Sequence, residues 1–324
     1  MGVDGRCSDV TGLPTKSQAL AQIRSDRRAV LLVNTRSRRG ARYYDRARAQ
    51  LQDRGFILTA AHAVSDPAAQ LSTLLPQILA ERPRLLVVGG GDGTIASVVA
   101  HLANTDTVLG YLPLGTTNNF GRSLGLPLRL NAAVDVIATG KIADVDLGLA
   151  NGFVFANLVS LGISAVVAER TSSSLKRRLG RAGYALTALR ALLSHQPFAA
   201  SIGTDGMSWR VSTHQLNIAN GRTHAGATIA ADAHINDRLL VVYTLGGSSR
   251  ASTVRAAVRQ ALTPHRPLER KGYRSGSEFV ISTDRPLPVD VDGEIITRTP
   301  LHVQVVPDAL RIIVPQEFDD EDPA

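Results

Sequence analysis

A short apolar run that passes through glycines into a helical pattern constrains the fold of this chain most. Four apolar residues, Leu85–Val88, precede Gly89-Gly90-Gly91-Asp92-Gly93-Thr94, and apolar residues then recur at helical spacing: Ile95, Val98, Val99 and Leu102. Glycines let the backbone approach a ligand closely, and the first turn of a helix presents free N–H groups to an anion. The segment predicts a phosphate-binding loop between a buried strand and a helix.

Asp92 is the unexpected residue in this loop, because a carboxylate beside phosphates repels them. It is explained if a divalent cation or a cationic side chain lies between the two. A tight connection in an ordinary α/β fold would also explain the glycines. The spacing matches neither the dinucleotide-binding fingerprint nor the Walker A loop.

A second loop of the same kind follows the next strand, predicted over Thr107–Leu112. Its sequence is Pro113-Leu114-Gly115-Thr116-Thr117-Asn118-Asn119-Phe120-Gly121-Arg122, which combines hydroxyls, amides and an arginine with a glycine. Neighbouring parallel strands would bring both loops to one edge of the sheet, where α/β folds bind their ligands.

These paired motifs, GGDGT and then P-L-G-T-x-N-x-F-x-R, resemble the diacylglycerol kinase catalytic-domain family over roughly residues 29–315. The wider superfamily includes NAD kinases and phosphofructokinases, and the second loop is similar to that of the lipid branch. The resemblance implies ATP and Mg²⁺ as cofactors and phosphoryl transfer to a lipid hydroxyl, with diacylglycerol as the first choice of acceptor.

The order of elements predicts two domains in this chain of 324 residues. Strands alternate with helices up to residue 145, which predicts an α/β fold with a doubly wound parallel sheet. Hairpin turns at Asn151-Gly152 and Asp205-Gly206 begin a β-sandwich-rich C-terminal domain. We expect a flexible leader over 1–27, an ATP-binding α/β domain over 28–145, a β-rich domain over 146–315 that completes the active site, and an acidic tail over 316–324.

The resemblance also implies a set of nucleotide-site residues. The family's turn after the first strand reads N-P-x-S-G, and here it is Asn34-Thr35-Arg36-Ser37-Arg38, so Asn34 is retained. Ser65 occupies the place of a nucleotide-contacting hydroxyl, although it would serve equally well as a helix N-cap. The expected ATP-binding residues are Asn34, Ser65, Gly89, Gly90, Gly91, Asp92, Gly93, Thr94, Gly115, Thr116 and Asn118.

Two residues of the second loop are expected to meet the acceptor. Asn119 stands where the family usually has aspartate, so a cationic acceptor such as sphingosine is disfavoured. Arg122 is suited to stabilising phosphate charge, and a solvated surface arginine is the alternative.

The segment Asp292-Gly293-Glu294 matches the family's D-G-E, which is assigned to base catalysis, although Asp-Gly is also an ordinary hairpin turn. Two positions apart on an extended chain, Asp292 and Glu294 are expected to point to the same side. One of them would accept the proton of the acceptor hydroxyl. Asp92 would act from the opposite domain, through Mg²⁺ or by orienting the nucleophile.

A structural Mg²⁺ site is implied near Asp232–Leu239, which is similar to the family's P-x-A-x-x-D-D-G-x-L. Carried over, Asp237 is the side-chain ligand, and His234 and Leu239 offer carbonyl oxygens. Asn236 and Arg238 depart from that pattern.

Net charge and amino-acid composition limit the classes of partner that this chain can be expected to bind. A net charge of +8 favours anionic partners such as ATP and acidic lipid headgroups, with biased codon usage as the alternative explanation. Aromatic residues make up 4%, and no nucleic-acid-binding motif is present, so we expect no nucleic acid partner. The basic segment Lys176–Arg181 suits either an anionic membrane surface or a solvated helix face.

The sequence contains no apolar run of about 18 residues, no signal sequence and no pair of cysteines, and it therefore predicts a cytoplasmic protein. A peripheral position at the inner face of the plasma membrane is left open. A homodimer is left open. Two alternative functions remain: a kinase with a soluble acceptor such as NAD, and a catalytically weak nucleotide-binding regulator. The departures at Thr35, Asn119, Asn236 and Arg238 motivate the second.

Overall fold

The computed structural model of the chain describes residues 14–36, 38–165, 195–221, 223–224, 227–228, 234–244, 248–249, 251–255 and 273–320. The sequence also predicts helices around Leu175–His195 and over Ala251–Leu262. The basic segment Lys176–Arg181 and nearly all of the first of these helices lie outside the described residues. Of the helix expected over Ala251–Leu262, only residues 251–255 are described, and they are helical.

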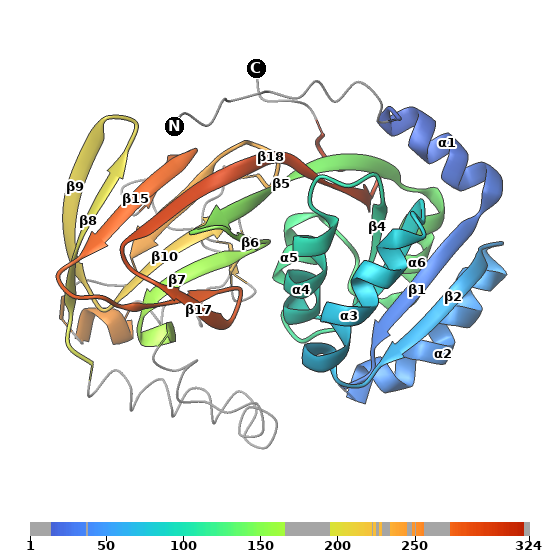
Figure 1. The fold of residues 1–324 in the computed structure, drawn as a ribbon, viewed down its shortest axis with the longest axis horizontal. Coiled ribbons are helices and arrows are strands. Elements are labelled where there is room, and N and C mark those ends of the chain that lie inside the picture. Colours follow the sequence, from blue (N-terminus) through green and yellow to red (C-terminus); the bar gives the residue numbers. More distant parts are fainter. Residues whose placement is uncertain are drawn as a thin grey trace.

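The N-terminal half is built on a parallel sheet covered by helices on both faces (Figure 1). Its strands lie in the order β2 (Ile57–Val64), β1 (Arg28–Asn34), β3 (Leu85–Gly90) and β4 (Val108–Pro113). One face packs against α2 (Arg38–Asp53) and α6 (Leu130–Thr139), and the other against α3 (Pro67–Ala80), α4 (Asp92–Leu102) and α5 (Asn119–Ser123). Every residue of β3 and β4 is buried, as the continuous apolar runs require. The doubly wound α/β prediction is confirmed.

The C-terminal half is mainly antiparallel β-structure in two packed sheets. One sheet continues from the N-terminal half, and its further strands are β5 (Lys141–Ala150), β6 (Phe153–Phe155), β8 (Phe198–Thr204), β9 (Met207–Thr213), β15 (Glu278–Thr283) and β18 (Leu301–Val314). The other contains β7 (Leu158–Gly162), β10 (Gln215–Asn220), β13 (Leu240–Thr244), β14 (Tyr273–Gly276), β16 (Pro288–Val291) and β17 (Glu294–Arg298). A short separate pair is formed by β11 (Thr223–His224) and β12 (Ala227–Thr228).

The two sheets share one apolar core, in which Phe155, Phe198 and Phe279 are fully buried. Both predicted hairpin turns are present, since Asn151-Gly152 and Asp205-Gly206 all adopt positive φ. The β-sandwich-rich prediction is therefore confirmed.

The two halves are joined by a pair of long strands, not by a linker (Figure 1). β5 runs straight through the expected boundary near residue 145. β18 is one strand, although the sequence predicts two, Leu301–Val306 and Leu310–Val314. It pairs with β4 at one end and with β15 at the other. It accommodates a bulge between Val306 and Leu310, where Asp308 has positive φ and its N–H donates to the buried Asp146 carboxylate at 2.9 Å.

The expectation of a flexible leader is wrong for residues 16–26, which form α1 (Lys16–Asp26). Thr15 and Gln18 make a reciprocal capping box at its start, and Ile23 is buried in the core beside β1. The acidic tail is likewise docked as far as it is described, because Asp320 accepts a hydrogen bond of 2.7 Å from Lys16 Nζ.

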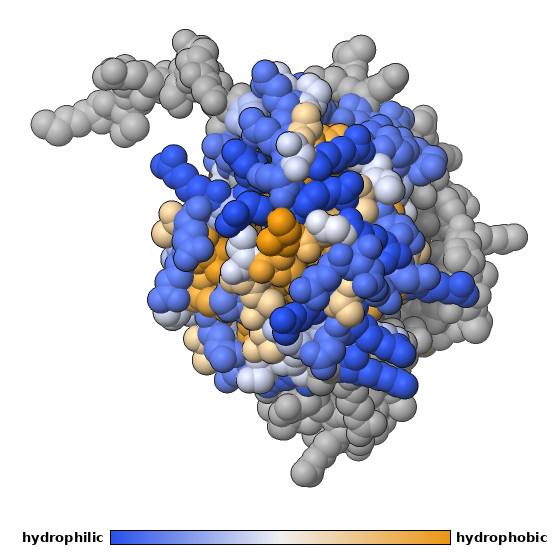
Figure 2. All heavy atoms as spheres, turned by 90° about the vertical axis from the view of Figure 1, so that its right-hand side faces the viewer, coloured by the Kyte–Doolittle hydropathy of each residue, from blue (hydrophilic) through white to orange (hydrophobic). Residues whose placement is uncertain are grey.

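The face seen in Figure 2, which is the right-hand side of Figure 1, carries an apolar area ringed by hydrophilic residues. β2 is the edge strand on this side of the sheet, and its Ile57 is 59% exposed. Within the part of the chain that the structure describes, no helix combines the length and apolar character needed to cross a bilayer.

Candidate active site

The site begins at the carboxyl edge of the parallel sheet, where the chain passes from β1 to β2 on one side and then crosses over to β3 on the other side of β1. Such a switch point is where open α/β sheets bind ligands. Asn34, the last residue of β1, spans it by donating from Nδ2 to Thr94 Oγ1 at 2.8 Å. Asn34 and Thr94, both predicted from the sequence, are thus brought together.

The first loop connects β3 to α4 without any side-chain cap. Gly91 is the N-cap residue, and its carbonyl oxygen accepts the N–H groups of Thr94 and Ile95. The first turn of α4 therefore directs its remaining N–H groups and the positive end of the helix dipole outward. This is the arrangement that binds phosphate.

Three glycines of the two loops are required by packing. A Cβ on Gly90 would lie 2.5 Å from Thr94 Cβ, and a Cβ on Gly115 would lie 2.5 Å from Gly91 Cα. The two loops thus meet backbone to backbone. Gly93 is different, because a Cβ there would meet nothing within 4 Å. The fold does not need glycine at position 93, so the open space above it is available to a ligand.

Asn118 holds the second loop together. It has positive φ and is 2% exposed; its Oδ1 accepts Gly115 N–H at 2.8 Å, and its Nδ2 donates to Gly115 O at 3.1 Å. Tyr111 hydroxyl donates to Gly90 O at 3.2 Å and so joins this loop to the first. Asn118 was predicted to bind the nucleotide directly, but the structure places its side chain inside the loop.

Asp92 connects the two loops through its carboxylate. Oδ2 accepts from Thr117 Oγ1 at 2.9 Å, and Oδ1 accepts from Phe120 N–H at 3.2 Å. Burial raises the pKa of Asp92, and these hydrogen bonds oppose that rise. Thr116, the residue of this loop predicted to bind ATP, is exposed, whereas Thr117, which was not predicted, bonds Asp92. One indication of Thr117 was present in the sequence, namely that its hydroxyl lies beside that of Thr116 in the same loop.

The remaining predicted loop residues lie around this centre. Ser65 is exposed at the end of β2, and its N–H donates to Gln70 Oε1 at 3.0 Å; the N-cap of α3 is Asp66. Asn119 is the half-buried first residue of α5, and Arg122 on the same helix is exposed and donates from Nε to Thr117 O at 2.9 Å.

Asp292 lies in the turn between β16 and β17 with positive φ. Its Oδ1 accepts the N–H groups of Asn157 and Leu158 at 3.0 and 2.9 Å, and its Oδ2 accepts Ala156 N–H at 2.7 Å. These donors lie in the connection between β6 and β7, so the carboxylate is fixed from the neighbouring strands.

The expectation that Asp292 and Glu294 point to the same side rested on an extended chain, and it is wrong because the turn intervenes. Glu294 begins β17 with its side chain exposed, and it has no hydrogen-bond or ion-pair partner among the residues that the structure describes.

Burial raises the pKa of Asp292 to about 6, although its three backbone hydrogen bonds act in the opposite direction. The negative charge of Asp92 contributes to the rise. The two carboxylates, one from each half of the molecule, are therefore close enough to interact. They define the two walls of the candidate site.

The donor chemistry of this site fits Mg²⁺, which binds proteins through one or two carboxylates and takes its other ligands from phosphates and water. Asp92 would hold the ion, with Asp292 facing it. A cation here would relieve the repulsion between the two carboxylates.

The residues of the second predicted Mg²⁺ site do not fit as well. Asp237 Oδ2 accepts His234 N–H at 2.9 Å and Oδ1 accepts Leu239 N–H at 3.0 Å. The carboxylate thus faces backbone donors, and the described residues contain no cluster of three metal-ligating side chains. Mg²⁺ at Asp237, with the carbonyls of His234 and Leu239, stays a prediction.

Comparison with known proteins gives a consistent result. Residues 28–150 match the diacylglycerol kinase catalytic domain, and residues 157–314 match the YegS C-terminal NAD kinase beta sandwich-like domain. A Pseudomonas putida protein named "Probable lipid kinase YegS-like" is 31% identical over 82% of this chain and 88% of its own length.

An uncharacterized Synechocystis protein is 30% identical over 73% of this chain, but the match spans only 56% of that protein's length. A crystal structure described as a diacylglycerol kinase from Bacillus anthracis superposes with a TM-score of 0.71 at 22% identity, covering 89% of this chain and 97% of that one. This likeness concerns the fold.

Proposed function

The chain belongs to the YegS-like lipid kinases of the diacylglycerol kinase family, and we propose that it transfers the γ-phosphoryl group of ATP to the hydroxyl of diacylglycerol. The observation that carries the proposal is the pairing of an uncapped, glycine-rich helix start with a fixed carboxylate, Asp292, from the other half of the molecule.

The N-terminal half binds ATP in this proposal. The first turn of α4 receives the phosphates, and the open space above Gly93 lets them approach the backbone. Asn34 and Ser65, at the ends of β1 and β2, line the adjoining nucleotide site. Arg122 is exposed beside the second loop and lies within reach of phosphate charge.

The C-terminal half supplies the base. The reaction requires a group that accepts the acceptor hydroxyl's proton as the oxygen attacks the γ-phosphorus. We assign this role to Asp292, because a pKa of about 6 leaves it ionised near neutral pH yet basic enough to take a proton. Its backbone hydrogen bonds fix the carboxylate before the substrate arrives.

Mg²⁺, when bound, would neutralise phosphate charge. Asp92 would hold the ion and, through Thr117 and Phe120, keep the second loop in register with the first.

A neutral acceptor agrees with the site, because Asn119 carries no charge to bind a cationic headgroup. The net charge of +8 favours a peripheral position on anionic membrane, which we place at the cytoplasmic face.

The test is transfer of radiolabel from the γ-phosphate of ATP to mixed micelles containing diacylglycerol, other neutral lipids, or none, with NAD as a soluble acceptor in parallel. We expect label in phosphatidic acid from the wild-type chain and none from Asp92→Ala. Label in another lipid would identify that lipid as the acceptor in place of diacylglycerol. Label in NAD alone, or no transfer despite ATP binding, would refute the lipid kinase assignment.

A further inference from the structure

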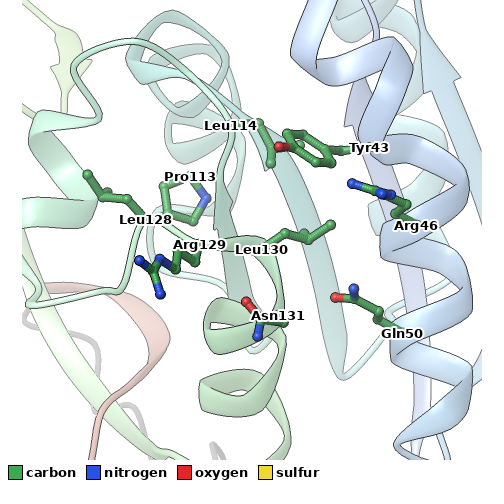
Figure 3. A pocket seen from close by; sticks show the side chains of 9 residues that line it. All are labelled: Tyr43, Arg46, Gln50, Pro113, Leu114, Leu128, Arg129, Leu130 and Asn131. Atoms are coloured by element: carbon green, nitrogen blue, oxygen red, sulfur yellow. The ribbon is translucent and has the colours of Figure 1, made fainter.

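A cavity of about 540 Å³ lies between α2 and α6, beside the start of the second loop (Figure 3). Its volume is within the range of small-molecule binding sites. The residues that line it are Tyr43, Arg46, Gln50, Pro113, Leu114, Leu128, Arg129, Leu130 and Asn131.

This cavity lies on the other face of the sheet from the two helices of the candidate active site, and among its lining residues only Pro113 and Leu114 belong to the second loop. α2 and α6 cover one face of the parallel sheet, whereas α4 and α5, which carry the phosphate loops, cover the other. Arg54, the residue after the end of α2, donates from Nε to Oδ1 of Asp135 in α6 at 2.6 Å. This contact joins the two helices at one end, and the cavity lies between them at the other end, near the end of β4.

Two arginines give the cavity a positive character. Arg46 comes from α2 and Arg129 is the N-cap of α6, and neither guanidinium forms an ion pair with any residue in the described part of the chain. No side chain caps the first turn of α6, of which Leu130 and Asn131 line the cavity. The helix dipole therefore adds to the attraction for an anion.

The remaining wall is apolar and aromatic, with one unsatisfied acceptor. Tyr43, Arg46 and Gln50 project from α2 toward α6, and Asn131 faces Gln50 from the other side (Figure 3). Arg46 Cζ lies 5.8 Å from the Tyr43 ring centroid. Gln50 Oε1 is buried without a hydrogen-bond partner in the described residues.

We propose that this cavity binds a small organic phosphate whose body is a planar or apolar group. The phosphate would be held by the guanidinium groups and the first turn of α6, and the body would pack against Tyr43, Leu114 and Leu130. Such a ligand would be a second one, distinct from the ATP of the active site.

The cavity wall is bonded directly to the phosphate loops. Leu114 N–H donates to Gly90 O at 2.8 Å, and the next residue, Gly115, packs against Gly91. A ligand that packs on Leu114 therefore contacts a segment that must keep its position for both loops to meet. Binding in the cavity is expected to alter ATP affinity, and ATP to alter binding in the cavity by the same factor.

The test is calorimetric titration of the full chain with phenyl phosphate, in the presence of a saturating non-hydrolysable ATP analogue that occupies the active site. Inorganic phosphate and phenol are titrated separately to divide the contributions of the anion and the ring. Arg46→Gln and Arg129→Gln remove the charges at nearly constant size. Arg48→Gln, an exposed arginine of α2 outside the cavity lining, is the matched control.

We expect phenyl phosphate to bind beside the ATP analogue, more tightly than either fragment. Its affinity should fall about tenfold, or about 1.4 kcal/mol, in Arg46→Gln and Arg129→Gln and stay unchanged in Arg48→Gln. Tyr43→Ala should weaken phenyl phosphate and leave inorganic phosphate unaffected. No binding, displacement by the ATP analogue, or equal loss in Arg48→Gln would overturn the proposal.

Discussion

The two walls of the candidate site are made in opposite ways. The wall from the N-terminal half is built from backbone: Gly91 and Gly115 pack together, and helix α4 begins without a side-chain cap. The wall from the C-terminal half is built around one side chain, the Asp292 carboxylate, which three backbone N–H groups hold in place.

The difference agrees with the charges that each wall would meet in the proposed reaction. Phosphate is a fixed anion, so the first wall offers N–H donors and excludes side chains that would block the approach. A proton from a hydroxyl needs an acceptor of suitable pKa, so the second wall buries a carboxylate. Neither wall can perform phosphoryl transfer alone, and the following predictions test each wall separately.

The largest effect is expected from Asp292→Asn, which removes the base at nearly constant size and leaves Ala156 N–H, or the pair from Asn157 and Leu158, facing an amide NH₂ that cannot accept a hydrogen bond. We expect kcat to fall by about 10²–10⁴-fold, the usual contribution of general base catalysis. Glu294→Gln, which changes an exposed residue of the same turn, is the control, with a decrease below about tenfold expected. Steady-state kinetics of both variants decide the assignment, and a larger loss in Glu294→Gln would transfer the role of base to that residue.

The second prediction concerns the pH dependence of stability. The pKa of Asp292 rises from its ordinary value of 3.8 to about 6, so its stabilising contribution is complete below pH 3.8 and is lost as the pH rises through 6. This corresponds to up to about 3 kcal/mol of unfolding free energy. Urea unfolding of wild type and Asp292→Asn between pH 4 and pH 7 should give curves that diverge by this amount. Parallel curves would contradict the buried state of the carboxylate.

The third prediction separates two kinds of glycine in the first wall. Gly115→Ala should destabilise the fold by about 1–3 kcal/mol, because its Cβ would overlap the Gly91 backbone. Gly93→Ala should leave the unfolding free energy unchanged or slightly higher and raise the KM for ATP about tenfold, because the methyl group enters ligand space. Thermal unfolding and ATP kinetics measure the two effects. An unchanged KM in Gly93→Ala would place the phosphates elsewhere.

The smallest effect is expected at the switch point of the sheet. Asn34→Ala and Thr94→Val each remove the 2.8 Å hydrogen bond between β1 and α4, at a cost of about 1 kcal/mol. Because both changes break the same bond, the double variant should cost less than the sum of the two single ones. Additive losses in unfolding free energy would mean that the bond contributes nothing.

The sequence predicted the elements that local pattern determines. Continuous apolar runs located β3 and β4, a period of 3.6 residues located α4, and parallel pairing then placed the two loops together. Local sequence pattern could not predict how the Asp292 carboxylate is oriented, because the N–H groups that orient it come from residues 156–158, more than 130 positions away in the chain. Asn118 is a related case, because its amide closes its own loop, and the local sequence does not distinguish such an amide from one that binds a ligand; its contact with the nucleotide stays a prediction.

Two further features were missed, and only the first of them had a local signal. The capping box of Thr15 and Gln18 marks the start of α1, in a segment whose polar composition suggested a loose leader. The sequence predicted two strands separated by residues 307–309, whereas β18 continues through this segment with a bulge held by Asp146. That acceptor lies 162 positions away, so the continuity of β18 could not be read locally.

The strand pair β5 and β18 has a mechanical consequence. Two-domain enzymes that close around a substrate usually bend at a few hinge residues in flexible connections. Here an antiparallel ladder crosses from one half to the other, so bending would have to break hydrogen bonds in a continuous sheet. The two walls of the candidate site should therefore keep a nearly constant separation through a catalytic cycle, and the two halves should lose their structure together when the chain is heated.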